Sequence, residues 1–327
     1  MRPATALICE FIDEHKQAYG VALICRALSA HGVQIAPRTY WAHRSHSAAP
    51  SKRALWDTTI TEILAGIYEP DAKGKRRPES LYGYVKMWGY LQRQGIEVAR
   101  CTVARLMRVN GWRGVTRARW VRTTEADRSA PRAPDLVNRH WRVPAPNQLA
   151  VADFTYAPMD SSGFGYTAFI VDAFAGVITG WECSLTKDTS FVQRALSHAV
   201  SFRSRQGRPF GDTVHHSDAG SQYTAIHYGE ALMIAGLKPS IGTVGDALDN
   251  ALCETTIGLY KTECVRGDSP FRNGPINTLA DLEDITSAWV SWYNTSRLMH
   301  RLGRRPPAET EAEYYDQLQV GMHADHT

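Results

Sequence analysis

Three acidic residues, Asp153, Asp218 and Glu254, are the side chains of this 327-residue chain best suited to chemistry. They lie in the segments VADFTY, HHSDAGSQY and DNALCETTIGLYKTE, with 64 and then 35 residues between the acids. Three carboxylates can hold two divalent metal ions against a phosphodiester. The spacing alone proves little, because an Asp followed 36 positions later by a Glu is expected about once by chance at near-average acid usage. The sequence around each acid therefore has to carry the hypothesis.

The segments after residue 147 predict an α/β domain. LAVADFTYA, YTAFIVDAF and GVITGWECS are short, apolar and separated by glycine-containing turns, as strands are. A helix follows at SFVQRALSHAVSF, then a strand at VHHSD, a helix at AIHYGEALMIAGL and a short strand around PSIG. This order predicts Asp153 within the first strand and Asp218 at the tip of the fourth.

Glu254 is predicted on the next helix, which we expect to begin near Asp246. Helical periodicity places one apolar stripe toward the core, made of Leu248, Ala251, Leu252, Thr255 and Leu259. Asn250, Glu254 and Lys261 fall together on another face. We therefore expect Glu254 to face the two Asp residues and Lys261 to reach a phosphate. Asn250 stabilises the start of this helix or contacts DNA.

Charge is divided sharply between the two halves of the chain. Residues 1–150 carry 24 Lys and Arg against 12 Asp and Glu, whereas residues 151–327 carry 13 against 21. This division is expected when one part grips a polyanion and the other concentrates metal-binding carboxylates. Two ordinary domains of different charge remain the alternative.

The basic half contains a repeated unit. Shifting the chain by 63 residues aligns residues 19–40 with 82–103, including Tyr-Gly, a central Leu, the glycine of a turn and a Thr. Each copy predicts a helix, a glycine turn and a second helix, the form of a helix-turn-helix module. For the first copy, a plain helical hairpin stays open.

The second copy is followed by seven arginines and no acid between Arg100 and Arg122. Arginine forks suit phosphates, so a DNA contact is favoured over a solvated basic face. The candidate DNA-binding residues are Arg100, Arg105, Arg108, Arg113, Arg117 and Arg119, together with Lys261 and Asn250. Residues 123–146 hold four prolines and few apolar residues, which is typical of a linker.

The segments VADFTY, HHSDAGSQY, GDALDNALCETTIGLYKTE and WYNTSRLMHRLGRRPPAE together resemble the catalytic domain of retroviral-integrase-like DDE transposases. More narrowly, they resemble the OrfB-type transposases of bacterial insertion sequences. The resemblance implies an α/β, ribonuclease H-like core preceded by all-α helix-turn-helix units. It also implies that Asp153, Asp218 and Glu254 form the catalytic, metal-binding triad. One departure is that Asn294, Arg297 and His300 are spaced one residue more widely than in the family pattern.

The resemblance further implies the reaction and its partners. A DNA transposase of this kind performs metal-dependent 3′-end cleavage and strand transfer with two Mg²⁺ or Mn²⁺ ions. Its partners are the insertion-sequence ends and target DNA, with a homo-oligomer on DNA and, in related systems, an upstream-frame product. A bacterial cytoplasm, associated with the nucleoid, is expected. A signal-peptide pattern, a membrane-spanning run and Cys-x-x-Cys motifs are all absent from the sequence, which agrees with that location.

We expect five regions: a helical, helix-turn-helix-like unit at 1–50, a DNA-binding helix-turn-helix unit at 51–122, the linker at 123–146, the catalytic core at 147–310 and a tail at 311–327. Two alternative functions remain. One is another nuclease on the ribonuclease H fold, which the basic front end disfavours. The other is a non-catalytic DNA-binding protein derived from a transposase, which the three acids disfavour.

Overall fold

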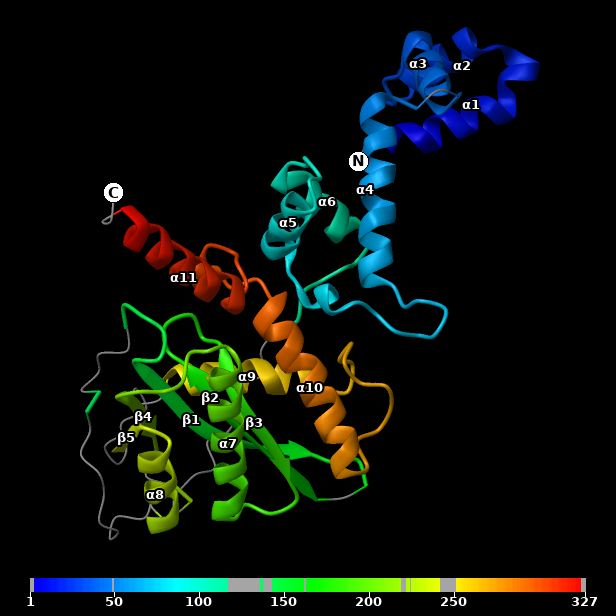
Figure 1. The fold of residues 1–327 in the computed structure, drawn as a ribbon. Helices are drawn as coiled ribbons and strands as arrows, with labels where there is room; N and C mark the ends of the chain where they lie inside the picture. Colours follow the sequence, from blue (N-terminus) through cyan, green and yellow to red (C-terminus); the bar gives the residue numbers. More distant parts are fainter. Residues whose placement is uncertain are drawn as a thin grey trace. The chain divides into compact units, whose positions relative to one another are not determined.

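The computed structural model describes residues 3–48, 50–116, 136–137, 143–161, 163–218, 222–223, 225–241 and 251–324 (Figure 1). The chain separates into two compact units, Met1–Ala65 and Gly66–Thr327, and each is described by itself. Arg117, Arg119, Asn250 and most of the expected linker lie outside the described residues. In the described part of the chain, no helix combines the length and the apolar character needed to cross a bilayer.

The first unit is a small helical cluster. It contains α1 (Thr5–Tyr19), α2 (Val21–Ala30), α3 (Pro37–Ala48) and the beginning of α4 (Lys52–Tyr68). Its core is made of apolar side chains from the first three helices and from the segment between α2 and α3: Ile8, Cys9, Ile12, Ile24, Cys25, Ile35 and Tyr40. The Tyr40 hydroxyl donates to Asp13 Oδ1 at 2.7 Å, which ties α3 to α1.

The second unit begins with a helix-turn-helix made of η1 (Pro78–Leu81), α5 (Tyr84–Arg93) and α6 (Arg100–Val109). The glycine turns of the two repeats share one geometry, with φ of 86° at Gly32 and 75° at Gly95. The residue after each glycine donates its N–H back to the helix, Val33 to Leu28 O at 2.8 Å and Ile96 to Leu91 O at 3.0 Å. The predicted repeat is confirmed.

The rest of the second unit is built on a five-stranded mixed sheet with the order β3-β2-β1-β4-β5. Its strands are β1 (Leu149–Pro158), β2 (Phe164–Asp172), β3 (Ile178–Ser184), β4 (Thr213–Ser217) and β5 (Leu237–Ile241). The first three pair antiparallel, and β4 and β5 run parallel to β1. This is the ribonuclease H-like arrangement, so the predicted α/β class is confirmed.

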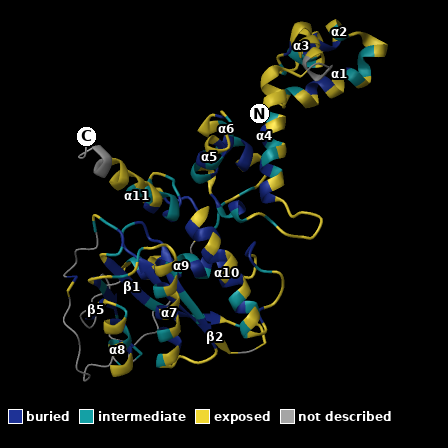
Figure 2. Cartoon of the chain, viewed as in Figure 1, coloured by how far each residue is buried: buried dark blue, intermediate teal, exposed yellow. Residues whose placement is uncertain are grey.

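Helices cover both faces of the sheet. Ala152 and Ile170 of the strands pack with α7 (Thr189–Arg205) and α8 (Ile226–Ile234) on one face. On the other face, the Phe169 ring meets Tyr260 of α9 (Ala251–Tyr260) at 5.0 Å and Trp289 of α10 (Leu279–Thr295) at 6.0 Å. Figure 2 shows the buried residues gathered along the strands and on the helix sides turned toward them.

The expected core face of the Glu254 helix is wrong. The buried residues of α9 are Cys253, Thr256, Ile257 and Tyr260, whereas Ala251 and Thr255 of the expected stripe are exposed. The physical reason is that the buried hydroxyls have partners. Thr256 Oγ1 donates to Leu252 O at 3.1 Å, and the Tyr260 hydroxyl bonds Thr286 Oγ1 at 2.7 Å. A satisfied polar residue can be buried as readily as an apolar one.

Two last elements follow α10: η3 (His300–Leu302) and α11 (Pro307–Ala324). Leu282, Ile285, Trp289 and Trp292 of α10 are buried and belong to the core. α11 begins before residue 311, and its Glu311 reaches Arg203 of α7 in a fully buried ion pair. Arg203 also pairs with Asp172 at 3.0 Å, so the final helix is anchored to the sheet.

Candidate active site

Strand pairing places Asp153 and Asp218 side by side. β1 and β4 are parallel, with Ala152 opposite Ser217, so that Asp153 and Asp218 are the next residues on their respective chains. Side chains alternate between the faces of a sheet, and neighbouring paired positions point to the same face. Ala152 packs on the α7 side. Asp153 and Asp218 therefore point to the opposite face, which α9 covers.

Helix α9 brings Glu254 to that face. Its first turn carries Glu254, which is exposed, next to the fully buried Cys253. The helix packs against the sheet through its buried residues Cys253, Ile257 and Tyr260. This packing places the neighbouring Glu254 at the rim of the acidic site.

The electrostatics show that these acids act on one another. Burial raises the pKa of the Asp153 carboxyl well above its ordinary value. The nearby charges of Asp218 and Glu254 raise this pKa further, while the Phe154 N–H, donated to Asp153 Oδ1 at 2.7 Å, and the Lys261 ammonium lower it. Neighbouring charges act on a carboxyl most strongly when they lie within about 4–6 Å of it.

The site is rich in negative charge and contains oxygen donors of the kind that hard divalent cations prefer. Among the residues that the structure describes, no three His, Cys, Asp or Glu side chains lie close enough together to hold an ion as they stand. Asp218 and Glu254 raise the pKa of Asp153, so negative charge gathers here that a bound divalent cation would neutralise. The donor set therefore fits a divalent metal.

Lys261 begins a turn that the sequence does not predict. After α9, the backbone widens into the π-helical turn η2 (Lys261–Val265), in which Thr262 to Val265 are buried. Lys261 itself is half-buried, and burial lowers the pKa of its ammonium while Asp153 raises it. Such turns are frequent at functional sites. The Lys261 ammonium, which lowers the pKa of Asp153, thus comes from this turn.

Two further residues of the site were missed by sequence reasoning. The Tyr223 ring is buried, and its hydroxyl has no hydrogen-bond partner among the described residues. Burial raises the pKa of Tyr223 and of the Cys253 thiol, and the charge of Asp153 raises both further. The only signal was position, because Tyr223 ends the HHSDAGSQY segment and Cys253 precedes Glu254.

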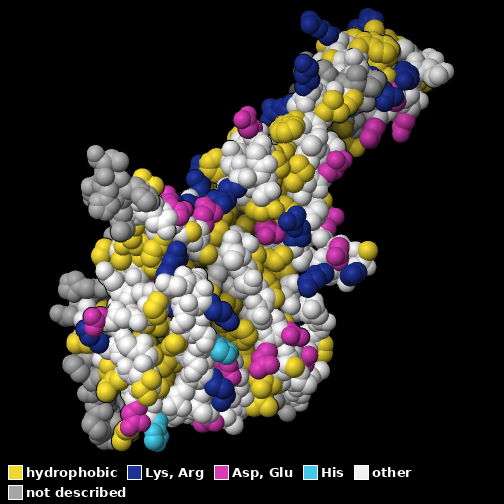
Figure 3. Space-filling view, in the orientation of Figure 1, with side chains coloured by type: hydrophobic (Ala, Val, Ile, Leu, Met, Phe, Trp, Pro, Cys, Tyr) yellow, Lys and Arg dark blue, Asp and Glu magenta, His cyan; other side chains and the backbone are white. Residues whose placement is uncertain are grey.

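The arginines of the second helix-turn-helix form a separate site. Arg100, Arg108 and Arg113 line a hollow of about 570 Å³ with Tyr84 and Trp112. Arg105, which was also expected to contact DNA, is half-buried and does not line this hollow. On the face drawn in Figure 3, cations are interspersed with other side chains and do not form one continuous patch.

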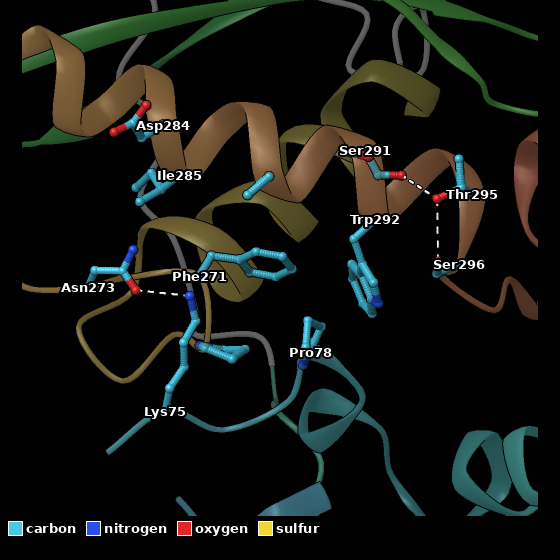
Figure 4. Close-up of a pocket in the computed structure, with 12 residues that line it drawn as sticks. Lys75, Pro78, Phe271, Asn273, Asp284, Ile285, Ser291, Trp292, Thr295 and Ser296 are labelled. Atoms are coloured by element: carbon cyan, nitrogen blue, oxygen red, sulfur yellow. Dashed lines mark hydrogen bonds between the residues drawn. The ribbon is translucent and has the colours of Figure 1, made fainter. Parts of the chain in front are cut away.

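A second cavity lies where the helix-turn-helix meets the core (Figure 4). It measures about 420 Å³ and lies among Pro78, Phe271 and Trp292. At its edge, Lys75 Nζ donates to Asn273 Oδ1 at 2.9 Å. Since none of the three acids lines it, this cavity belongs to the junction and not to the acidic site.

Of the residues with the unusual spacing, Asn294 and Arg297 brace the core, whereas His300 does not. The Asn294 side chain accepts from Ile178 N and donates to Ile178 O, both at 2.9 Å, along the edge of β3. Arg297 is buried and binds both carboxylate oxygens of Glu263, at 2.8 and 2.6 Å. His300 is exposed on η3. None of these contacts reaches the three acids.

Comparisons with protein families agree with this geometry. Residues 143–247 and 235–307 match models described as Integrase core domain, and residues 62–120 match an HTH-like domain. The core matches cover all five strands and the helices α7 to α10.

Named relatives extend the likeness to almost the whole chain. The transposase for insertion sequence element IS629 of Shigella sonnei is 44% identical, over 93% of this chain and 95% of its own length. A Mycobacterium tuberculosis protein of insertion sequence element IS986/IS6110 is also 44% identical, over 87% of this chain and 98% of its own.

Solved structures are more distant. A chain of the simian T-cell lymphotropic virus intasome has a TM-score of 0.44 and 16% identity, covering 68% of this chain and 69% of its own. The HTLV-2 integrase catalytic core domain in complex with magnesium has a TM-score of 0.39 and 18% identity, covering 51% of this chain and 98% of its own.

Proposed function

Because this chain belongs to the family of insertion-sequence transposases with an integrase core, we propose that Asp153, Asp218 and Glu254 are its catalytic carboxylates. The chain is a DNA transposase, a polynucleotidyl transferase with an HTH-like domain ahead of its core. One observation carries the assignment of the site: the Asp153 carboxylate responds to Asp218, Glu254 and Lys261 together.

The three carboxylates would hold divalent metal, and we propose two Mg²⁺ or Mn²⁺ ions. When bound, such ions supply the positive charge that activates an attacking oxygen and stabilises a leaving one. The oxygen-only donor set supports this choice over zinc. Asp153 is held by β1, Asp218 by the end of β4 and Glu254 by α9, so all three acids sit on well-packed elements.

The proposed reaction has two stages in the same site. Water first cleaves the DNA at the element end and frees a 3′-hydroxyl, which then attacks a phosphodiester of the target DNA. Lys261 contributes a positive charge beside Asp153, where it would bind and orient a phosphate oxygen. Asn250 is a further proposed DNA contact.

The proposed DNA-binding residues of the front end are Arg100, Arg105, Arg108, Arg113, Arg117 and Arg119. The hollow at α6 supports Arg100, Arg108 and Arg113 in particular. Joining two element ends requires two sites, so we propose a homo-oligomer on DNA, with an upstream-frame product as a further partner. The proposed division of labour keeps residues 51–122 for end recognition and 147–310 for catalysis.

The test replaces single acids without changing their shape. Asp153→Asn and Glu254→Gln should each lower strand joining, with Mg²⁺ and labelled element-end DNA, by at least about a hundredfold. The affinity for the same DNA in EDTA should stay within about threefold, because the front end supplies most phosphate contacts.

Asp212→Asn and Glu230→Gln are matched controls. Asp212 is exposed, with only a surface ion pair to Lys238, and Glu230 is exposed on α8. Both variants should join DNA at the normal rate. Joining that persists in either active-site variant would show that the catalytic acids lie elsewhere.

A further inference from the structure

The face of α5 that meets the core carries an excess of positive charge. The Tyr82 hydroxyl, just ahead of α5, donates to Ser296 O at 3.3 Å and accepts from Leu298 N at 3.0 Å. The Arg304 guanidinium lies 4.9 Å from the centre of the Trp88 ring. The α5 face and the chain between α10 and α11 are therefore packed against each other.

Lys86 sits in the middle of this contact. It follows Tyr82 by one helical turn, and its ammonium lies 5.6 Å from the centre of the Tyr82 ring. One turn further along the same face of α5, a Cβ on Gly89 would lie 3.0 Å from Arg304 Cδ. Lys86 is half-buried, and no hydrogen bond or ion pair of its ammonium occurs among the described residues.

The carboxylates near Lys86 are already paired with arginines. Glu263 faces Lys86 from η2, but both of its oxygens accept from Arg297, and Trp289 Nε1 approaches one of them at 3.4 Å. Glu79, near Tyr82, pairs with Arg77 at 3.4 Å. Lys86 is thus left without an acid of its own.

The cations affect one another. Burial and, to a smaller extent, the charge of Arg297 lower the pKa of Lys86 to about 8, against the opposing effect of Glu263. Burial also lowers the pKa of His300, as do Lys86, Arg304 and Arg297. Lys86, Arg297, Arg304 and the His300 imidazole thus lie together, and the carboxylate that acts on Lys86, Glu263, is already bound by Arg297. Such crowding costs stability in the free protein and is relieved by an anion.

We propose that Lys86, His300 and Arg304 form a phosphate-binding site for the DNA backbone, at the contact between the helix-turn-helix and the core. This site rests on the proposed DNA-binding function but lies outside both the acidic site and the arginine hollow. A backbone phosphate suits it because α5 is the first helix of the helix-turn-helix, and in such modules this helix crosses the DNA backbone. The three side chains offer the point charge and planar donors that phosphate oxygens accept.

The first experiment uses the near-neutral pKa of Lys86. Binding of the full chain to a fluorescent DNA duplex of arbitrary sequence is measured in EDTA at pH 7 and pH 9. The protonated fraction of Lys86 falls about tenfold over this interval, so wild-type affinity should fall by up to about tenfold. Lys86→Arg keeps its charge at both pH values, so it should bind at pH 7 as the wild type does and lose little affinity at pH 9.

The second experiment separates binding from structure. Lys86→Met should weaken DNA binding several-fold at pH 7 and lower the slope of log affinity against log salt by about 0.9. Its melting temperature should stay the same or rise, because an uncompensated charge has been removed. The Lys187→Met variant, at an exposed position of the core, should leave affinity unchanged.

Each other outcome is informative. Equal DNA affinity for the wild type and Lys86→Met would overturn the site, as would a joint loss of affinity and melting temperature that Lys86→Arg does not restore. If inorganic phosphate raised the melting temperature of the wild type alone while DNA affinity stayed equal, the site would serve free phosphate and not DNA. No metal or cleavage enters these assays, so they succeed or fail independently of the catalytic assignment.

Discussion

At the scale of single residues, the buried pair of Glu263 and Arg297 matters most for the position of Lys261. Glu263 belongs to the turn that begins with Lys261, and Arg297 follows α10. The pair is bidentate and almost fully buried. In addition, Ser269 Oγ donates to the Glu263 carbonyl at 2.6 Å. These bonds fix the turn from which Lys261 extends toward the acids.

Breaking this pair should be costly. Arg297→Met leaves the Glu263 carboxylate buried without its cation, which should lower the free energy of unfolding by about 3–5 kcal/mol in urea titrations. The double variant Glu263→Gln with Arg297→Met should lose less, because neither charge is then left alone.

Arg194→Met provides the control, since Arg194 pairs with Glu182 at the surface. Its effect should stay below about 1 kcal/mol. A loss of less than about 1 kcal/mol in Arg297→Met as well would mean that the pair contributes little to the fold.

At the scale of elements, α7 crosses β3 so closely that only glycine fits at position 180. A Cβ on Gly180 would lie 2.3 Å from Ala195 O and 2.8 Å from Ala199 Cβ. Gly180→Ala must therefore push the helix away from the sheet. We expect a loss of about 1–3 kcal/mol in unfolding free energy.

Gly211→Ala is the matched control, because its Cβ would meet nothing within 4 Å and its φ is not in the left-handed region. This change should be neutral or slightly stabilising. If both variants unfolded alike, the close approach of α7 would not be what limits residue 180.

Sequence reasoning was strongest at this scale for strands and weakest for α9. Every predicted strand is present, because apolar runs bounded by glycine turns leave few alternatives. The core face of α9 was misjudged because Thr256 and Tyr260 look polar. Their hydroxyls find partners inside the domain, Tyr260 on Thr286 of α10. Such partners are far away in the sequence, so periodicity cannot reveal them.

At the scale of the whole molecule, the proposed division of labour is that the basic half holds DNA and the acidic half cuts it. If the hollow at α6 is the main grip, replacing Arg100, Arg108 and Arg113 by Gln should weaken DNA binding strongly. The slope of log affinity against log salt should fall by about two to three, close to 0.9 for each phosphate that the protein no longer neutralises.

The control replaces three exposed cations of the core, Lys187, Arg205 and Lys238, by Gln. This triple variant removes the same charge from the molecule. An equal fall in slope would mean that net charge, and not the geometry of the hollow, determines how the protein grips DNA.

The amino-acid sequence by itself determined the repeat, the strands and the identity of the three acids, because each depends on local patterns or on short motifs. Tertiary structure decided what these residues meet. The pairing of β1 with β4 sets Asp153 beside Asp218, and the packing of α9 brings Glu254 and Lys261 to them. It also decided that Arg297 braces Glu263 while Lys86 stays without an acid. The reason is physical: charge and burial depend on distances through space between segments that the chain keeps far apart.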